Sequence, residues 1–179
     1  MLPVTDTDKR YGLVSMALHW IIAACLLGAY MTGEGVGRDV VMTNIHASLS
    51  ILAVLLVFVR IAWRVVVKAP TPMNDDARLM LAQKVVMGVL AILAPIALIV
   101  SGTVILQALG HNLPFFGVDI VQGYAVVDRP FARFMKDGHE VLSSLFMLAF
   151  FAHFGAAFWH HVIKKDNTFK RMVPWGKVG

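Results

Sequence analysis

The sequence contains one cysteine and few charged residues. Cys25 is the only cysteine among 179 residues, which excludes an intramolecular disulfide and every metal motif built on cysteine pairs. Charged residues make up 15% of the chain and hydrophobic residues 58%, whereas soluble domains carry about 25% and about 45–50%. The composition therefore indicates an integral membrane protein, and it favours one helical domain over residues 1–179 without a separate soluble module.

Four long apolar runs are each sufficient to cross a bilayer as a helix, for which about 20 residues are needed. We predict membrane spans at residues 13–31, 45–67, 85–109 and 139–163. Pro95 lies inside the third run and predicts a kink there. The connections carry glycine, proline and charged residues that end helices. The predicted fold is all-α, a four-helix bundle within the membrane.

The basic residues lie beside the hydrophobic runs, so the net charge of +5 is a signal of topology and does not indicate a nucleic-acid partner. With four spans, both termini lie on the same side as the second connection. That side would carry twelve basic residues and the other side four (Arg38, Arg129, Arg133 and Lys136). The positive-inside rule therefore predicts a multi-pass membrane protein with both termini in the cytoplasm.

Six histidines lie in or at the ends of the predicted spans, where polar side chains are costly and usually functional, and four of them match in depth. His139 and His153 are fourteen residues apart, close to four helical turns, so both leave one face about 21 Å apart along the axis. The alternating direction of the spans places His19 at the depth of His153 and His46 at the depth of His139. The sequence thus predicts an inner pair, His19 with His153, and an outer pair, His46 with His139.

Two opposed imidazoles at each depth favour a metal centre that needs only two protein ligands. Tetrahedral zinc takes four ligands, whereas haem iron brings four nitrogens of its own and needs only axial ligands. No C-x-x-C-H motif occurs, so such a haem would be bound non-covalently. With both axial positions filled, it would transfer electrons without a position for oxygen. The alternative is a non-redox four-helix membrane protein whose histidines lie at the interfaces.

Other residues are candidates for contacts around these centres. Arg60 and Arg64 lie one turn apart at the cytoplasmic end of the second span, suited to the propionates of an inner haem. The alternative for both is an interaction with lipid phosphates. His160, seven residues after His153, is a candidate contact for an inner propionate or a quinone. The candidate contacts for the propionates of an outer haem are Lys136, Arg38 and Arg129. Four glycines either leave room for a flat macrocycle or allow close helix packing, namely Gly28, Gly88, Gly102 and Gly155.

Several motifs resemble those of the prokaryotic cytochrome b561 family, which are four-helix membrane proteins with two b haems. The resembling motifs, in chain order, are L-H-W at residues 18–20, I-H at 45–46, V-R-I-A-W-R at 59–64, G-H-E at 138–140, His153 with the His160–His161 pair, and K-D-N-T-F-K-R-M at 165–172. The resemblance implies that His19, His46, His139 and His153 are the axial ligands. One departure is that relatives often carry a histidine early in the third span, where this chain has Gln83 and Lys84.

The resemblance also implies electron exchange with the ubiquinone pool, and some members oxidise superoxide at the outer face. We therefore expect a haem-dependent, quinone-linked oxidoreductase with a periplasmic donor, superoxide being favoured. The alternative is a b-type subunit that relays electrons for a separate periplasmic dehydrogenase or hydrogenase. The sequence does not locate the quinone site, and it allows a homodimer without requiring one.

Overall fold

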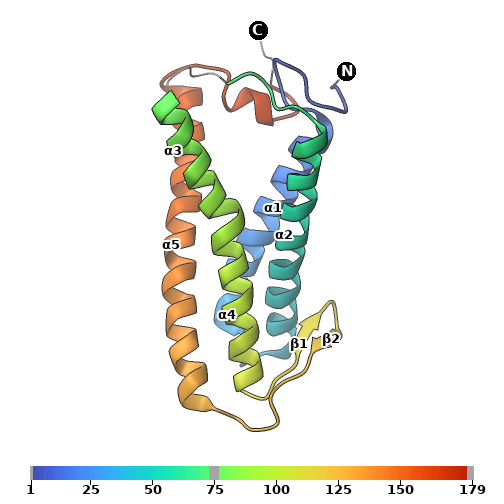
Figure 1. The fold of residues 1–179 in the computed structure, drawn as a ribbon, viewed down its shortest axis with the longest axis vertical. Coiled ribbons are helices and arrows are strands. Elements are labelled where there is room, and N and C mark those ends of the chain that lie inside the picture. Colours follow the sequence, from blue (N-terminus) through green and yellow to red (C-terminus); the bar gives the residue numbers. More distant parts are fainter. Residues whose placement is uncertain (1, 73–76, 177–179) are drawn as a thin grey trace.

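Four long helices dominate the computed structural model, which describes residues 2–72 and 77–176 (Figure 1). The first two are α1 (Leu13–Thr32) and α2 (Val40–Val66), joined through the 3₁₀ turn η1 (Gly33–Gly35). The third membrane helix consists of α3 (Ala77–Gly88), the π-helical segment η2 (Val89–Leu93) and α4 (Ala94–Ala108), and the last is α5 (Arg129–Val162). All four are long and apolar enough to cross a membrane. The predicted all-α membrane bundle is confirmed.

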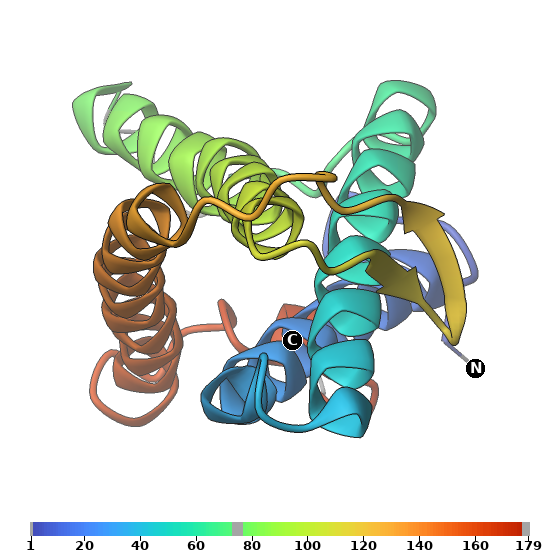
Figure 2. The same cartoon turned by 90° about the horizontal axis from the view of Figure 1, so that it is seen from below.

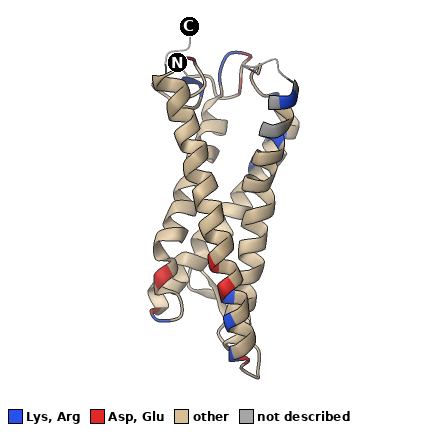
Figure 3. Cartoon of the chain, turned by 90° about the vertical axis from the view of Figure 1, so that its left-hand side faces the viewer, with Lys and Arg blue, Asp and Glu red and all other residues tan. Residues whose placement is uncertain are grey.

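The helices pair along the chain as two hairpins. α1 packs along α2, and α4 packs along α5, while α2 contacts α4 between the two hairpins. Viewed along the bundle, the four helices surround a common centre (Figure 2). Both termini lie at one end, which we call the termini end, and the connection from α4 to α5 lies at the other, which we call the hairpin end (Figure 1). Charged side chains gather toward these two ends and leave the middle of the bundle uncharged (Figure 3).

Two helices begin earlier than the apolar runs predicted. α2 begins at Val40 because the carboxylate of Asp39 accepts hydrogen bonds from the backbone N–H groups of Val41 (2.7 Å) and Met42 (3.0 Å). α5 begins at Arg129, ten residues before the predicted span, because the carboxylate of Asp128 accepts from the Phe131 N–H (3.0 Å). Hydrophobicity marks where a helix enters lipid, whereas these caps mark where the helix begins. Both caps lie at the hairpin end.

The kink predicted at Pro95 takes the form of a π-helical turn. Proline has no N–H, and its ring crowds the carbonyl four residues earlier, which is that of Ala91. Ala91 lies within η2, which widens the helix immediately before the proline. Widening of this kind moves the crowded carbonyl aside without ending the helix.

A small β-hairpin in the last connection was not predicted. β1 (Leu113–Phe115) pairs antiparallel with β2 (Val118–Val121) and lies on the outer flank of α2 (Figure 2). The turn residues Phe116 and Gly117 have φ angles of 48° and 86°, as a tight two-residue turn requires. The Phe116 N–H donates to the Ser48 hydroxyl (2.8 Å), which attaches the hairpin to α2.

The segment after α5 folds back across the termini end and includes the 3₁₀ turn η3 (Lys170–Met172). The guanidinium of Arg10 donates to the carbonyls of Val173 (3.0 Å) and Gly176 (3.2 Å). The indole of Trp20 donates to the Met172 carbonyl (2.8 Å). The two terminal segments therefore cover this end of the bundle together.

Candidate functional site

The outer pair comes together at the hairpin end of the bundle. His46 extends from α2 and His139 from α5, and their ring centres are 6.4 Å apart. Both imidazoles are half-buried. Because α2 and α5 begin earlier than predicted, His46 lies about two turns and His139 about three turns inside its helix rather than at the helix end. Their depths still match.

Each outer imidazole is oriented through its Nδ1 atom. The Nδ1 of His46 lies 2.7 Å from the carbonyl oxygen of Ala29, on α1. The Nδ1 of His139 lies 2.8 Å from the hydroxyl oxygen of Ser101, on α4. A carbonyl only accepts, so His46 carries its proton on Nδ1, which leaves Nε2 with a free lone pair. Metal-binding histidines are held by an acceptor on the other ring nitrogen in this way.

The inner pair comes together nearer the termini end. His19 extends from α1 and His153 from α5, and their ring centres are 6.3 Å apart. His19 is half-buried and His153 is exposed. Across residues 2–72 and 77–176 neither imidazole makes a hydrogen bond. The guanidinium of Arg60 lies close enough to act electrostatically on both rings.

The ring separations suit one metal ion between each pair. An imidazole nitrogen binds a first-row metal at about 2 Å, and the ring centre lies about 1.1 Å behind it, so two trans imidazoles have centres about 6 Å apart. Both observed separations agree with that value. In the described part of the chain no group of three or more His, Cys, Asp and Glu side chains gathers as a metal site. Two donors per level therefore suit haem iron, which supplies its other four nitrogens from the porphyrin.

A cavity of about 510 Å³ opens beside the outer pair, within the range of cofactor sites. Apolar side chains of α1, α2, α4 and α5 line its interior, including Leu26, Ile51 and Met147. Its mouth at the hairpin end carries charged groups of both signs, namely Arg38, Lys136, Glu34 and Glu140. An apolar macrocycle with a charged edge suits such a cavity, so the residues present fit a haem at the outer pair.

The glycines near the sites differ in their surroundings. A Cβ on Gly102 would lie 3.4 Å from the His139 ring, and a Cβ on Gly33 would lie 3.6 Å from the His46 ring. At Gly28 a Cβ would collide with Leu49 (2.8 Å), so this glycine allows α1 and α2 to pack closely. A Cβ added at Gly88 or at Gly155 would have no neighbouring atom within 4 Å. Only Gly102 among the four predicted positions therefore contacts a paired histidine.

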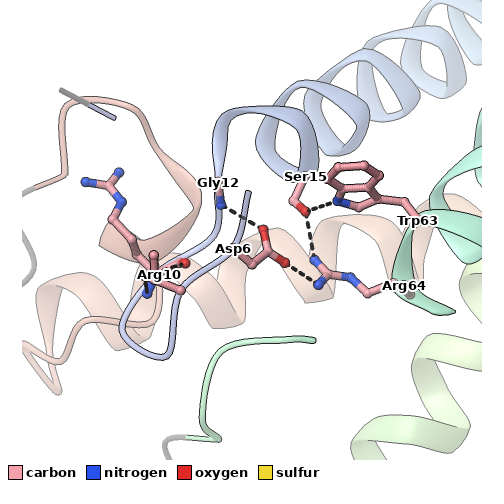
Figure 4. A network of polar contacts seen from close by, with 7 residues as sticks. Asp6, Arg10, Gly12, Ser15, Trp63 and Arg64 are labelled. Atoms are coloured by element: carbon pink, nitrogen blue, oxygen red, sulfur yellow. Dashed lines mark hydrogen bonds and ion pairs between the residues drawn. The ribbon is translucent and has the colours of Figure 1, made fainter. Parts of the chain in front are cut away.

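The two candidate arginines have different partners. Arg64 forms an ion pair with Asp6 and donates to the Ser15 hydroxyl (3.2 Å) (Figure 4). Its guanidinium also lies 4.9 Å from the centre of the Tyr11 ring. The Trp63 indole donates to the same hydroxyl (2.9 Å). In the described residues, the half-buried guanidinium of Arg60 has neither a hydrogen bond nor an ion pair.

His160 also has a partner within the chain. Its Nδ1 contacts the carboxylate of Asp166, in the segment that follows α5. Partial burial raises the pKa of Asp166, but the hydrogen bonds from His160 and Thr168 outweigh it and lower that pKa to about 2. The exposed loop residue His111 lies at the hairpin end, away from both pairs. The side chain of Gln83 lies outside the described part of the structure, and Lys84 is exposed.

Sequence reasoning missed the groups that orient the histidines. Ser101 and the Ala29 carbonyl gave no signal, because one is a common helix residue and the other is backbone. A serine directly before Gly102 in an apolar run was the only available sign.

Four membrane helices with two facing histidine pairs at two depths define a membrane cytochrome of the b type. The comparisons with known proteins agree. Residues 10–175 match the family model described as prokaryotic cytochrome b561, and the chain belongs to that family. The family implies a membrane electron-transfer protein that binds haem b.

Curated relatives cover nearly the whole chain. Cytochrome b561 homolog 2 of Escherichia coli (strain K12) is 30% identical over 178 residues, 94% of each chain. Cytochrome b561 homolog 1 of the same organism is 24% identical over 93% of this chain and 98% of its own. The probable superoxide oxidase CybB of Yersinia pestis is 26% identical over 93% of this chain and 97% of its own.

Proposed function

We propose that this protein binds two b haems and carries electrons across the membrane between a periplasmic donor and the quinone pool. His46 and His139 hold the outer haem, and His19 and His153 hold the inner one. Haem iron supplies one-electron oxidation and reduction. The observation that carries the proposal is the pair of ring separations, 6.4 Å and 6.3 Å, at two depths of one bundle.

The protein residues provide ligation, orientation and exclusion of water. Each pair would supply both protein ligands of a bound haem iron, which would leave no position for an exogenous ligand. The apolar lining at the outer pair removes water from the iron environment and limits the reorganisation that accompanies electron transfer. Arg60 has no hydrogen bond or ion pair among the described residues, so we assign it to the propionates of the inner haem. Arg64 is engaged by Asp6 and Ser15, and we give it no propionate role.

Superoxide is the donor that we favour, with ubiquinone as acceptor. The relative from Yersinia pestis is named a probable superoxide oxidase. Arg38 in the lining of the outer cavity, with the exposed Arg129 and Arg133 near the start of α5, provides cationic groups for an anion. Some acidic groups at this end are engaged elsewhere, since Asp128 caps α5 and Glu140 pairs with Lys136.

Positive charge supports the orientation. Eleven of the twelve basic residues counted above lie in the described part of the chain and belong to the termini end, so we place that end in the cytoplasm and the hairpin end outside. The outer pair then faces a periplasmic donor, and the inner pair lies toward the cytoplasmic side.

Haem stoichiometry in single variants tests the ligand assignment. His19→Ala, His46→Ala, His139→Ala and His153→Ala should each lose one of two haems per chain, measured as pyridine haemochrome. His19→Ala and His153→Ala should lose the same haem. His111→Ala is the matched control and should keep both. Loss of different haems from His19→Ala and His153→Ala would overturn the pairing.

Turnover of the purified protein tests the donor. Superoxide should reduce the haems, and added ubiquinone should reoxidise them catalytically. A protein that is inert to superoxide and co-purifies with a periplasmic redox enzyme would instead be a relay subunit.

A further inference from the structure

We propose that Ser101 is a positioning residue for the outer haem site, where it fixes the imidazole of His139 and lowers the reduction potential of that haem. The inference rests on the proposed function, because it concerns a residue that acts on a proposed ligand. Ser101 belongs to α4, whereas His139 belongs to α5, so the contact joins two helices.

The hydrogen-bond pattern assigns the direction of the contact. The Ser101 hydroxyl lies 2.8 Å from the Ala97 carbonyl and 3.1 Å from the Leu98 carbonyl. A hydroxyl has one proton, and carbonyls only accept, so this proton is directed back along α4. The Ser101 oxygen therefore accepts from Nδ1–H of His139 at 2.8 Å. His139 then presents its unprotonated Nε2 to the metal.

The neighbouring residue makes room for the same ring. A Cβ on Gly102 would lie 3.4 Å from Cε1 of His139, which leaves little space for a larger side chain. Ser101 thus holds one edge of the imidazole while Gly102 leaves its adjacent edge free. His46 has an equivalent arrangement, in which the Ala29 carbonyl accepts from Nδ1 and Gly33 faces the ring.

The acceptor also changes the chemistry of the ligand. A hydrogen bond from Nδ1–H gives the imidazole more anionic character and makes Nε2 a stronger donor. A stronger donor stabilises ferric over ferrous iron and lowers the potential. The inner pair differs, because its imidazoles make no hydrogen bond in the described residues and the Arg60 cation lies near them. This asymmetry predicts a lower potential at the outer site than at the inner site.

A serine within a membrane helix often bonds only to its own helix, and the experiment separates that role from positioning. Ser101→Ala removes the acceptor, and Ser101→Thr restores a hydroxyl that bonds back to the same carbonyls. The matched control is Ser48→Ala, since Ser48 is a buried serine of α2 whose hydroxyl donates to the Asn44 side chain (3.2 Å) and which is not among the residues that line the outer cavity. The measurements on the purified full-length holoprotein are haem stoichiometry, spectroelectrochemical titration and low-temperature EPR.

We expect Ser101→Ala to raise one of the two midpoint potentials and to alter one of the two ferric EPR signals, with the other haem unchanged. Ser101→Thr should restore both values, and Ser48→Ala should match the wild type. If Ser101→Ala loses the outer haem, retention by Ser101→Thr still supports positioning, whereas loss from both variants overturns it. Unchanged potentials and EPR signals in Ser101→Ala overturn it as well. A wild-type protein without a bis-histidine haem spectrum would refute the proposed function before any variant is compared.

Discussion

Replacing Asp6 with asparagine should destabilise the protein far more than removing the exposed Lys136–Glu140 pair. The Asp6 carboxylate is 0% exposed, and its Arg64 partner is 25% exposed. It also accepts from the Gly12 N–H at 2.8 Å, so it connects the N-terminal segment to α2 (Figure 4). In the Lys136–Glu140 pair both side chains are 58% exposed and lie one turn apart on α5.

The magnitudes follow from burial. Removing one partner of a buried ion pair costs about 3–5 kcal/mol, because the remaining charge stays unpaired. Arg64 is partly exposed and keeps its contacts to Ser15 and Tyr11, so we expect about 2–3 kcal/mol for Asp6→Asn. An exposed pair one turn apart on a helix contributes about 0.3–0.5 kcal/mol, which is the loss we expect for Glu140→Gln.

Reversible unfolding in mixed detergent and dodecyl sulfate micelles, followed by circular dichroism, measures both free energies of unfolding. The double variant Asp6→Asn/Arg64→Gln completes a cycle that isolates the coupling between the two side chains. Equal losses in Asp6→Asn and Glu140→Gln, or an additive double variant, would refute the reasoning from burial.

Three further outcomes follow from the site. Gly102→Ala should retain the outer haem, because its Cβ would lie 3.4 Å from the His139 ring, an ordinary contact distance. Gly102→Val adds carbons beyond that contact and should lose at least half of one haem per chain, measured as pyridine haemochrome. Equal haem loss in both variants would contradict the steric argument. Arg60→Gln should lower the inner potential in a spectroelectrochemical titration, because a cation near both imidazoles favours the reduced state; an unmoved potential would exclude Arg60 from the site. The folded-state pKa of Asp166 lies below its ordinary value of 3.8, at about 2, so its contribution to stability is present above about 3.8 and is lost as the pH falls toward about 2. Asp166→Asn should therefore lower the midpoint temperature of thermal unfolding at pH 6 and should change it little near pH 2. A difference in midpoint temperature that stays constant between pH 6 and pH 2 would argue against the pairing of Asp166 with His160.

The sequence predicted the bundle and the histidine pairs for one physical reason. Helical rise and antiparallel direction determine depth, and these depend only on spacing along the chain. His139 and His153 keep their fourteen-residue separation wherever α5 begins. The starting residues of α2 and α5 were predicted too late, because capping by Asp39 and Asp128 depends on local geometry rather than hydrophobicity.

Contacts between distant segments could not be predicted in the same way. Arg60 and Arg64 are equivalent by spacing, yet the N-terminal segment folds back so that Asp6 forms an ion pair with Arg64 and is only an electrostatic neighbour of Arg60. His160 likewise has Asp166 as partner because the chain turns back after α5. The β-hairpin at residues 113–121 is short, and its turn depends on a positive φ at Phe116, which residue type does not favour.

The π-helical turn at η2 determines which way the rest of its span faces. One extra residue in a helix rotates everything beyond it by about 100° relative to the part before it. Ser101 and Gly102 lie downstream of that turn, on the side that meets α5. The faces that the upstream and downstream halves of this span present to their neighbours are therefore set independently. Deleting one residue from η2 would rotate Ser101 so that its hydroxyl points away from His139.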